Sequence, residues 1–191
     1  RKFSSMALLS AIIIPTTLIS IRNLLIKSYT FQEAGIWDAV IRLSGFYMLL
    51  FSSGLTLYYM PKLASLSTDE EFKSELKEYF KTLVPIFLLM IVLIYLFKNL
   101  IINIAFTQEF NKVSEILIWQ LLGDFFRIMS LAFGYQILVK TMMFKFFFIE
   151  IVYNLSYFIL SYYLMQNFAS EGVVMAYFFA NVLMFFVFLF M

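Results

Sequence analysis

The stretch "WQLLGDFFRIMSLAFGY", residues 119–135, places Asp124 and Arg127 in the middle of a long apolar run. A charge at the centre of a bilayer costs from about 2.5 to more than about 10 kcal/mol, depending on how the cost is measured. On a helix that turns 100° per residue, the charged and small polar residues share one face. The members of this face are Gln120, Gly123, Asp124, Arg127, Ser130 and Gly134. The stretch therefore predicts a membrane-spanning helix whose polar face is turned toward protein or water.

The composition of the whole chain is that of an all-α integral membrane protein. Of its 191 residues, 63% are hydrophobic and only 14% are charged, whereas soluble domains carry about 25% charged residues. A spanning helix needs about 20 predominantly apolar residues. Six segments fit this length, at 3–25, 36–60, 82–105, 116–139, 142–165 and 172–191. The chain begins with Arg and stops inside an apolar run, so we expect it to be a fragment of a longer protein.

Several kinds of chemistry are not expected from this composition. The chain contains no Cys and no His, which removes thiol catalysis, disulfides and the commonest metal ligand. The net charge of +2 is too small to favour nucleic acid as a partner. The connections between apolar runs are too short to shape a catalytic site outside the membrane. We therefore expect no enzyme activity, no catalytic residues, no metal site and no cofactor.

Lysine and arginine lie mainly at one end of the predicted helices. One set of ends holds eight of them: Arg1, Lys2, Lys62, Lys73, Lys77, Lys81, Lys140 and Lys145. The opposite loops hold three: Lys27, Lys98 and Lys112. Because cytoplasmic loops carry the excess of positive residues, the end with eight is predicted to be cytoplasmic. Both ends of the chain then lie on that side of the membrane.

The segment "STDEEFKSELKEYFK", residues 67–81, predicts a short amphipathic helix at the cytoplasmic membrane surface. Ser67 and Thr68 each precede a glutamate by three residues, which is the capping-box signature of a helix start. Asp69 and Lys73 are spaced to pair one turn apart. The apolar residues recur at helical spacing, at Phe72, Leu76, Tyr79 and Phe80. A solvated linker helix with no partner is the alternative.

Charged residues also interrupt three other predicted helices. Asp38 and Arg42 lie one turn apart in the second helix, Glu150 lies in the fifth, and Arg22 lies near the end of the first. Residues 82–97 of the third helix are apolar all round, so they are expected to face lipid. In one interpretation Asp124 with Arg127, and Asp38 with Arg42, are neutral pairs that hold helices together. Helix packing normally uses small residues at lower cost, which favours a water-filled polar cavity instead.

Three segments of the sequence resemble a known family. They are "RNLLIKSYTFQEAGIWDAVIRLS" at 22–44, "YYMPKLASL" at 58–66 and "IWQLLGDFFRIMSLAFGYQILVK" at 118–140. They look like the C-terminal half of Wzx-type flippases of lipid-linked oligosaccharides, including those for O-antigen and enterobacterial common antigen. These flippases are part of the multidrug/oligosaccharidyl-lipid/polysaccharide exporter superfamily. The most specific parts of the resemblance are Arg-x-Leu-Leu followed by Gly-Ile-Trp within 22–37, and Trp-Gln-Leu-x-Gly-Asp at 119–124.

The resemblance implies a twelve-helix transporter of the bacterial inner membrane, built from two six-helix lobes around a central cavity. This chain would be the second lobe, and the N-terminal lobe would be its partner. The implied substrate is an undecaprenyl-pyrophosphate-linked oligosaccharide, which alternating access moves from the cytoplasmic to the periplasmic leaflet. Polysaccharide polymerase and chain-length regulator proteins are further implied partners in O-antigen or lipopolysaccharide synthesis. Coupling to a proton or sodium gradient stays open.

The resemblance also bears on individual residues. Arg22 and Asp124 match the family pattern, and Arg127 matches a basic position, whereas Asp38 stands where a relative has a neutral amide. Arginine can bind phosphate oxygens with two parallel hydrogen bonds, which suits a pyrophosphate head. Aromatic walls for sugars are expected from Tyr47, Tyr58, Tyr135, Tyr153 and Tyr157. The candidate transport residues are Arg22, Asp38, Arg42, Asp124, Arg127 and Glu150.

Asp124 and Arg127 are three residues apart, so we expect them to pair directly on one helix when the cavity is empty. Two other functions stay open. A drug/cation antiporter of the same superfamily would use the buried acids to bind a cation. A non-transporting membrane subunit of a polysaccharide assembly complex would need no substrate site. The basic residues favour an anionic lipid.

Overall fold

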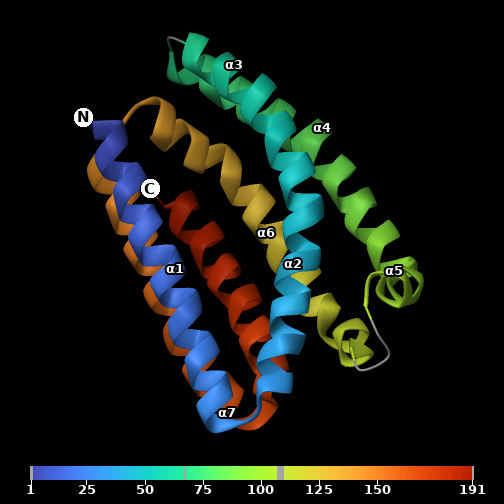
Figure 1. The fold of residues 1–191 in the computed structure, drawn as a ribbon. Helices are drawn as coiled ribbons and strands as arrows, with labels where there is room; N and C mark the ends of the chain where they lie inside the picture. The colour runs from blue at the N-terminus through green and yellow to red at the C-terminus, as the bar shows by residue number, and fades with distance from the viewer. Residues whose placement is uncertain (1, 67, 107–109, 191) are drawn as a thin grey trace.

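The computed structural model describes residues 2–66, 68–106 and 110–190, and all regular secondary structure in these ranges is helical (Figure 1). The predicted all-α class is therefore confirmed. The first half contains α1 (Lys2–Ser28), α2 (Phe31–Gly54), the π-helix η1 (Leu55–Tyr59) and α3 (Met60–Ser65). The second half contains α4 (Asp69–Leu96), α5 (Lys98–Ala105), α6 (Lys112–Val139) and α7 (Met143–Leu189).

Five helices in the described ranges are long and apolar enough to cross a membrane: Phe3–Ser28, Phe31–Ser65, Asp69–Leu96, Lys112–Val139 and Met143–Leu189. The last is interrupted at Ala169, whose φ of 49° and ψ of −127° are not helical. Figure 1 shows α7 turning back on itself, from its orange segment into its red segment. The prediction of six spans depends on counting these two segments separately.

A close backbone approach lies beside the turn in α7. A Cβ atom added to Gly172 would collide with the carbonyl oxygen of Leu164, on the preceding segment. Ala169 has a positive φ, which L-residues rarely adopt. Glycine at 172 thus allows the two segments to lie close together directly after this turn. The turn between the two segments contains no proline, and the close backbone contact at residue 172 leaves no room for a side chain.

Helix α4 differs from the prediction for residues 67–81. The capping box at Thr68 is confirmed, because the Thr68 hydroxyl accepts from the Glu71 amide and the Glu71 carboxylate accepts from the Thr68 amide. Ser67 lies outside the described residues. The helix does not stop at 81, however, and runs without a break to Leu96. The expected third span of 82–105 is divided instead at Phe97, between α4 and α5.

The apolar face of this charged segment packs against protein. Phe72 and Tyr79 are buried, and the Tyr79 hydroxyl donates to the Ile128 carbonyl oxygen of α6 at 2.7 Å. Asp69 does not pair with Lys73 as expected but with Lys140, whose Nζ lies 3.3 Å from Oδ1. Residues 69–81 are thus the first turns of α4, which continues directly into the apolar segment, and their position at the membrane surface stays a prediction. The apolar residues Phe72 and Tyr79 at the start of α4 are therefore buried within the protein, where Tyr79 contacts α6.

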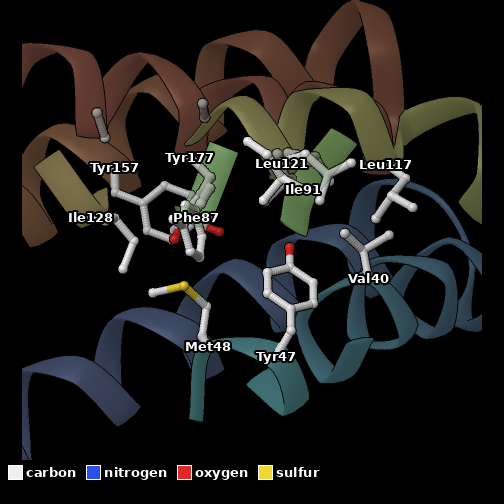
Figure 2. Close-up of a cluster of buried hydrophobic side chains, with 14 of the residues drawn as sticks. Val40, Tyr47, Met48, Phe87, Ile91, Leu117, Leu121, Ile128, Tyr157 and Tyr177 are labelled. Carbon is white, nitrogen blue, oxygen red and sulfur yellow. The ribbon is translucent and has the colours of Figure 1, made fainter. Parts of the chain in front are cut away.

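Helix α6 is the centre of the bundle. In its most apolar 18-residue stretch half of the residues are buried, compared with 11% in the corresponding stretch of α1 and 22% in that of α4. It packs against α2, α4 and α7, and Figure 2 shows side chains from all four helices meeting in one core. Figure 1 places α3, the start of α4 and the α6–α7 turn at one end of the bundle, and the α1–α2 turn with the start of α6 toward the other. The polar face of α6 is thus enclosed by neighbouring helices.

Candidate functional site: a polar cleft beside the central helix

A cleft of about 540 Å³ opens along the polar face of α6. Its wall is contributed by α1, α2, α6 and both segments of α7, and no described residue of α4 lines it. The polar and charged residues of the wall include Ser44, Ser52, Gln120, Arg127, Glu150 and Asn154. Gln120 and Arg127 belong to the polar face that the sequence predicts for residues 119–135, and Glu150 was named in the predicted fifth helix. The structure thus has a cleft with the third helix outside it, and apolar side chains such as Leu18, Met48 and Met184 line it beside the polar ones.

Asp124 lies behind the wall of this cleft and is completely buried. Its Oδ2 accepts hydrogen bonds from the Ser44 hydroxyl at 2.6 Å and from the Tyr47 hydroxyl at 2.5 Å. Its Oδ1 accepts from the Tyr177 hydroxyl at 2.7 Å and from the Gln120 amide at 3.4 Å. The carboxylate thereby joins α2, α6 and the second segment of α7.

These four donors match the hydrogen-bonding capacity of an ionised carboxylate, which accepts at about four lone-pair sites. A buried charge is costly unless it is both paired and hydrogen-bonded. Hydroxyl and amide groups supply the hydrogen bonds of Asp124, and the nearby cation Arg127 interacts with it without direct contact. Removing the carboxylate would leave buried donors on three helices without an acceptor.

Arg127 is exposed to the cleft, although α6 is the most buried long helix. Its Nη1 donates to the Tyr177 hydroxyl at 3.4 Å. Within the described residues it forms no ion pair with Asp124, so the prediction of a direct pair is wrong. The physical reason is that Tyr177 lies between the two ions and that other donors already occupy both Asp124 oxygens.

The Asp38 and Arg42 pair that the sequence suggests is also absent. Asp38 forms an ion pair with Arg22 of α1 instead, and the two side chains are 23% and 48% exposed. Arg42 is exposed and forms no ion pair with a described residue. The antiparallel packing of α1 against α2 brings Arg22 to Asp38, which spacing along one helix cannot reveal. None of these three residues lines the cleft.

Glu150 lies on the cleft wall as an intermediate, partly buried residue. Its Oε1 atom is buried and has no hydrogen-bond partner among the described residues. The Asn154 amide donates to the Glu150 carbonyl oxygen at 2.9 Å, and the Asn181 amide donates to the Tyr177 carbonyl oxygen at 2.8 Å. Each of these bonds uses one of the two N–H groups of the asparagine amide and does not involve its side-chain oxygen.

The predicted tyrosines are distributed between cleft, core and surface. Tyr153 and Tyr157 line the cleft with stacked rings whose centroids are 6.1 Å apart. Tyr47 binds Asp124 instead, and Tyr58 is 81% exposed. Tyr177 lines the cleft but was missed by the sequence interpretation. The sequence feature that could have indicated it is the placement of Tyr177 and Asn181 one turn apart in an otherwise apolar run.

A second polar cluster joins α2, α6 and the turn in α7, on segments near the opposite end from α3 in Figure 1. Glu33 accepts from Lys112 Nζ at 2.8 and 2.9 Å and from the Ser170 amide at 3.1 Å. The Trp119 indole donates to Glu171 at 3.2 Å, and the Tyr29 hydroxyl donates to the Met165 carbonyl oxygen. These contacts fix the turn in α7 to the neighbouring helices.

Comparison with known proteins relates the chain to membrane flippases. No protein family model and no solved structure matches the chain. Two curated proteins do match, the Lipid III flippases of Escherichia coli (strain K12) and Shigella flexneri, each 27% identical over 139 residues. This chain is similar to Lipid III flippases. The expected resemblance is thereby confirmed.

The matched residues are 73% of this chain but 33% of each flippase, so the chain spans about one third of the curated relatives it matches. Both relatives are named as flippases and not as enzymes. Five apolar helices of spanning length and this similarity identify a multi-pass membrane protein.

Proposed function

We propose that the chain is the second lobe of a twelve-helix flippase for polyprenyl-pyrophosphate-linked oligosaccharides. The flippase moves its substrate from the cytoplasmic to the periplasmic leaflet of the bacterial inner membrane by alternating access. It would serve O-antigen, enterobacterial common antigen or a related surface polysaccharide. The observation that carries the proposal is Arg127, an arginine exposed in a polar cleft within apolar helices.

The chemistry of the cleft suits this substrate. The guanidinium of Arg127 keeps its charge at any physiological pH and can bind two phosphate oxygens at once. The side-chain oxygens of Asn154 and Asn181 can accept from sugar hydroxyls, and Tyr153 and Tyr157 offer ring faces. The cleft therefore combines a site for an anionic head with a wall suited to sugars.

The other candidate residues take less direct roles in this proposal. Asp124 fixes the helices behind the cleft, and Glu150 limits how tightly the cleft holds an anion, because like charges repel. The Arg22–Asp38 pair holds α1 against α2. Arg42 is assigned to contact with the substrate or with the N-terminal lobe. Polymerase and chain-length regulator proteins are proposed partners of the complete flippase.

Complementation of a flippase-deficient strain tests the proposal, with the complete reading frame that contains this chain. Arg127→Ala should abolish export while membrane levels stay normal. Arg127→Lys should restore export only in part, because lysine lacks the planar fork of arginine. Full export by Arg127→Ala would contradict the proposal.

A double variant separates substrate binding from structural pairing. If the two charges served only to neutralise each other, Asp124→Asn combined with Arg127→Gln should recover the function lost in either single variant. We expect no recovery, because Arg127 is proposed to bind substrate. Immunoblots of the membrane fraction provide the control for folding and insertion.

Cysteine labelling tests the proposed orientation. The chain has no native cysteine, so Ser74→Cys and Asn111→Cys can each carry a single label. Both positions are exposed. A membrane-impermeant maleimide added to intact spheroplasts should modify position 111 and leave position 74 unmodified. Labelling of both from the same side would contradict the topology.

A drug/cation antiporter is the second candidate, and Glu150 is the observation that favours it. The Oε1 atom of Glu150 is buried in the cleft wall without a hydrogen-bond partner among the described residues. A cation carrier should depend on this acid and tolerate loss of Arg127. Resistance to cationic drugs that depends on Glu150 would favour the antiporter, and complementation of export would favour the flippase. A non-transporting subunit would show neither activity.

A further inference from the structure

We propose that Tyr177 is a positioning residue that keeps Arg127 available in the cleft by separating it from Asp124. The inference rests on the proposed role of Arg127 in binding a pyrophosphate. Without an intervening group, an aspartate and an arginine three residues apart on one helix would be expected to pair. The hydroxyl of Tyr177 occupies the position through which that pair would form.

The contacts of the Tyr177 hydroxyl assign it this place. It donates to Asp124 Oδ1 at 2.7 Å and accepts from Arg127 Nη1 at 3.4 Å. The shorter bond goes to the carboxylate, so the tyrosine proton belongs to Asp124 and a lone pair remains for the arginine. Asp124 is thereby satisfied without contacting Arg127. Among the described residues the arginine donates only this long hydrogen bond, which leaves most of its N–H groups for a ligand.

The ring of Tyr177 is held so that its hydroxyl cannot leave this position easily. The side chain is 7% exposed, and its ring packs edge-on against Tyr157 with centroids 5.9 Å apart. A Cβ atom at Gly123 would lie 2.5 Å from Tyr177 Cδ1, so the ring occupies a notch that only glycine provides. Figure 2 shows Tyr47 and Tyr177 projecting from opposite sides of the core with their hydroxyls turned inward.

Loss of the hydroxyl should change the partner of Arg127. In Tyr177→Phe, Asp124 Oδ1 loses its shorter hydrogen bond and keeps only the 3.4 Å bond from the Gln120 amide, and weakening the hydrogen bonds of a buried carboxylate is costly. Arg127 is the nearby cation that can fill this site. The guanidinium would then turn from the cleft to the carboxylate. The cleft of the variant should therefore bind an anion more weakly, although the arginine is still present.

The first test needs no substrate. Phenylglyoxal modifies accessible guanidinium groups, and mass spectrometry can follow Arg127 in the complete protein held in lipid nanodiscs. We expect Tyr177→Phe to slow modification of Arg127 about tenfold, as expected for one added hydrogen bond between charged groups. Arg42, exposed and outside the cleft, is the internal reference. An unchanged or faster rate at Arg127 would overturn the proposal.

Removal of the competing acid should reverse the effect. In Tyr177→Phe combined with Asp124→Asn, Arg127 has no carboxylate to pair with, and its modification rate should return to the wild-type value. A purely structural role for Tyr177 predicts no such rescue. Tyr157→Phe is the matched control, because this ring lines the same cleft and its hydroxyl bonds neither ion in the described structure. Equal slowing in Tyr157→Phe would also overturn the proposal.

A second route covers the case in which the double variant does not fold. Gly123→Ala places a Cβ against the Tyr177 ring and should displace its hydroxyl. It should slow modification of Arg127 as Tyr177→Phe does, with Asp124 and the tyrosine both unchanged. A wild-type rate in folded Gly123→Ala protein would contradict the proposed position of the ring.

Binding of inorganic pyrophosphate distinguishes this inference from the proposed function. We expect affinity to fall about tenfold in Tyr177→Phe and to recover in the double variant, in parallel with the modification rate. If wild-type protein does not bind pyrophosphate, the proposed function fails, while the modification rates still decide the role of Tyr177. Weak binding in Tyr177→Phe with an unchanged modification rate would overturn the positioning role alone.

Discussion

Asp38 on α2 and Asp124 on α6 are both followed by an arginine about one turn later, yet their surroundings differ completely. Asp38 is partly exposed and forms an ion pair with Arg22 from the neighbouring helix α1. Asp124 is completely buried and accepts hydrogen bonds from hydroxyl and amide groups, with no ion pair to a described residue. At Asp38 a cation contacts the carboxylate directly, whereas the groups that contact Asp124 within the described residues are neutral donors.

The difference teaches how a cation can stay available inside an apolar bundle. A carboxylate already satisfied by hydroxyls does not draw a nearby arginine to itself. Arg127 can therefore face the cleft, while Arg22 is committed to its ion pair. The acids also differ in what their removal would leave behind, and this difference orders the following predictions.

The largest effect is expected at Asp124. Asp124→Ala leaves donors from α2, α6 and α7 buried without an acceptor, and each such group costs about 1–3 kcal/mol. We expect the free energy of unfolding in detergent to fall by more than about 3 kcal/mol, as found when buried charge networks lose a member. Asp38→Ala is the matched control and should cost much less. Equal losses at the two positions would contradict the comparison.

An intermediate effect is expected at Glu33, which combines features of both sites. It accepts from Lys112 as Asp38 accepts from Arg22, and from the Ser170 amide as Asp124 accepts from neutral donors. Glu33→Gln keeps the size of the side chain but removes the charge. We expect it to lower stability by about 1–2 kcal/mol and to increase proteolysis at the turn near Ala169. Unchanged proteolysis there would show that Glu33 does not fix the turn.

The smallest effect is expected for the Arg22–Asp38 pair. Exposed ion pairs contribute about 0–1 kcal/mol, and the Arg22 side chain is 48% exposed. A double-mutant cycle with Arg22→Gln and Asp38→Asn should therefore give a coupling energy below about 1 kcal/mol. The same cycle between Asp124 and Tyr177 should give a larger value. If the Arg22–Asp38 coupling energy were the larger one, burial would not explain the difference in stability between the two acid sites.

Periodicity within single helices could be read from the sequence, and contacts between helices could not. The polar faces of residues 116–139 and 142–165 predicted the cleft, because spacing along a helix determines which side chains share a face. The expected pairs at Asp38 and Asp124 were wrong, because Arg22 and Tyr177 approach from other helices. The hydrogen bond from Tyr79 of α4 to α6 is likewise a contact between helices, which the charged pattern of 67–81 does not encode.

The affinity of the complete protein for farnesyl pyrophosphate, measured in wild type, Arg127→Ala and Glu150→Gln, tests most directly whether the cleft binds an anionic head. Both residues lie on the cleft wall and carry opposite charges. We predict binding about tenfold weaker in Arg127→Ala, through loss of charge-assisted hydrogen bonds. Glu150→Gln should bind as tightly as wild type or more tightly, because a negative charge has been removed. Binding that survives in Arg127→Ala but is lost in Glu150→Gln would contradict recognition of a pyrophosphate by this cleft.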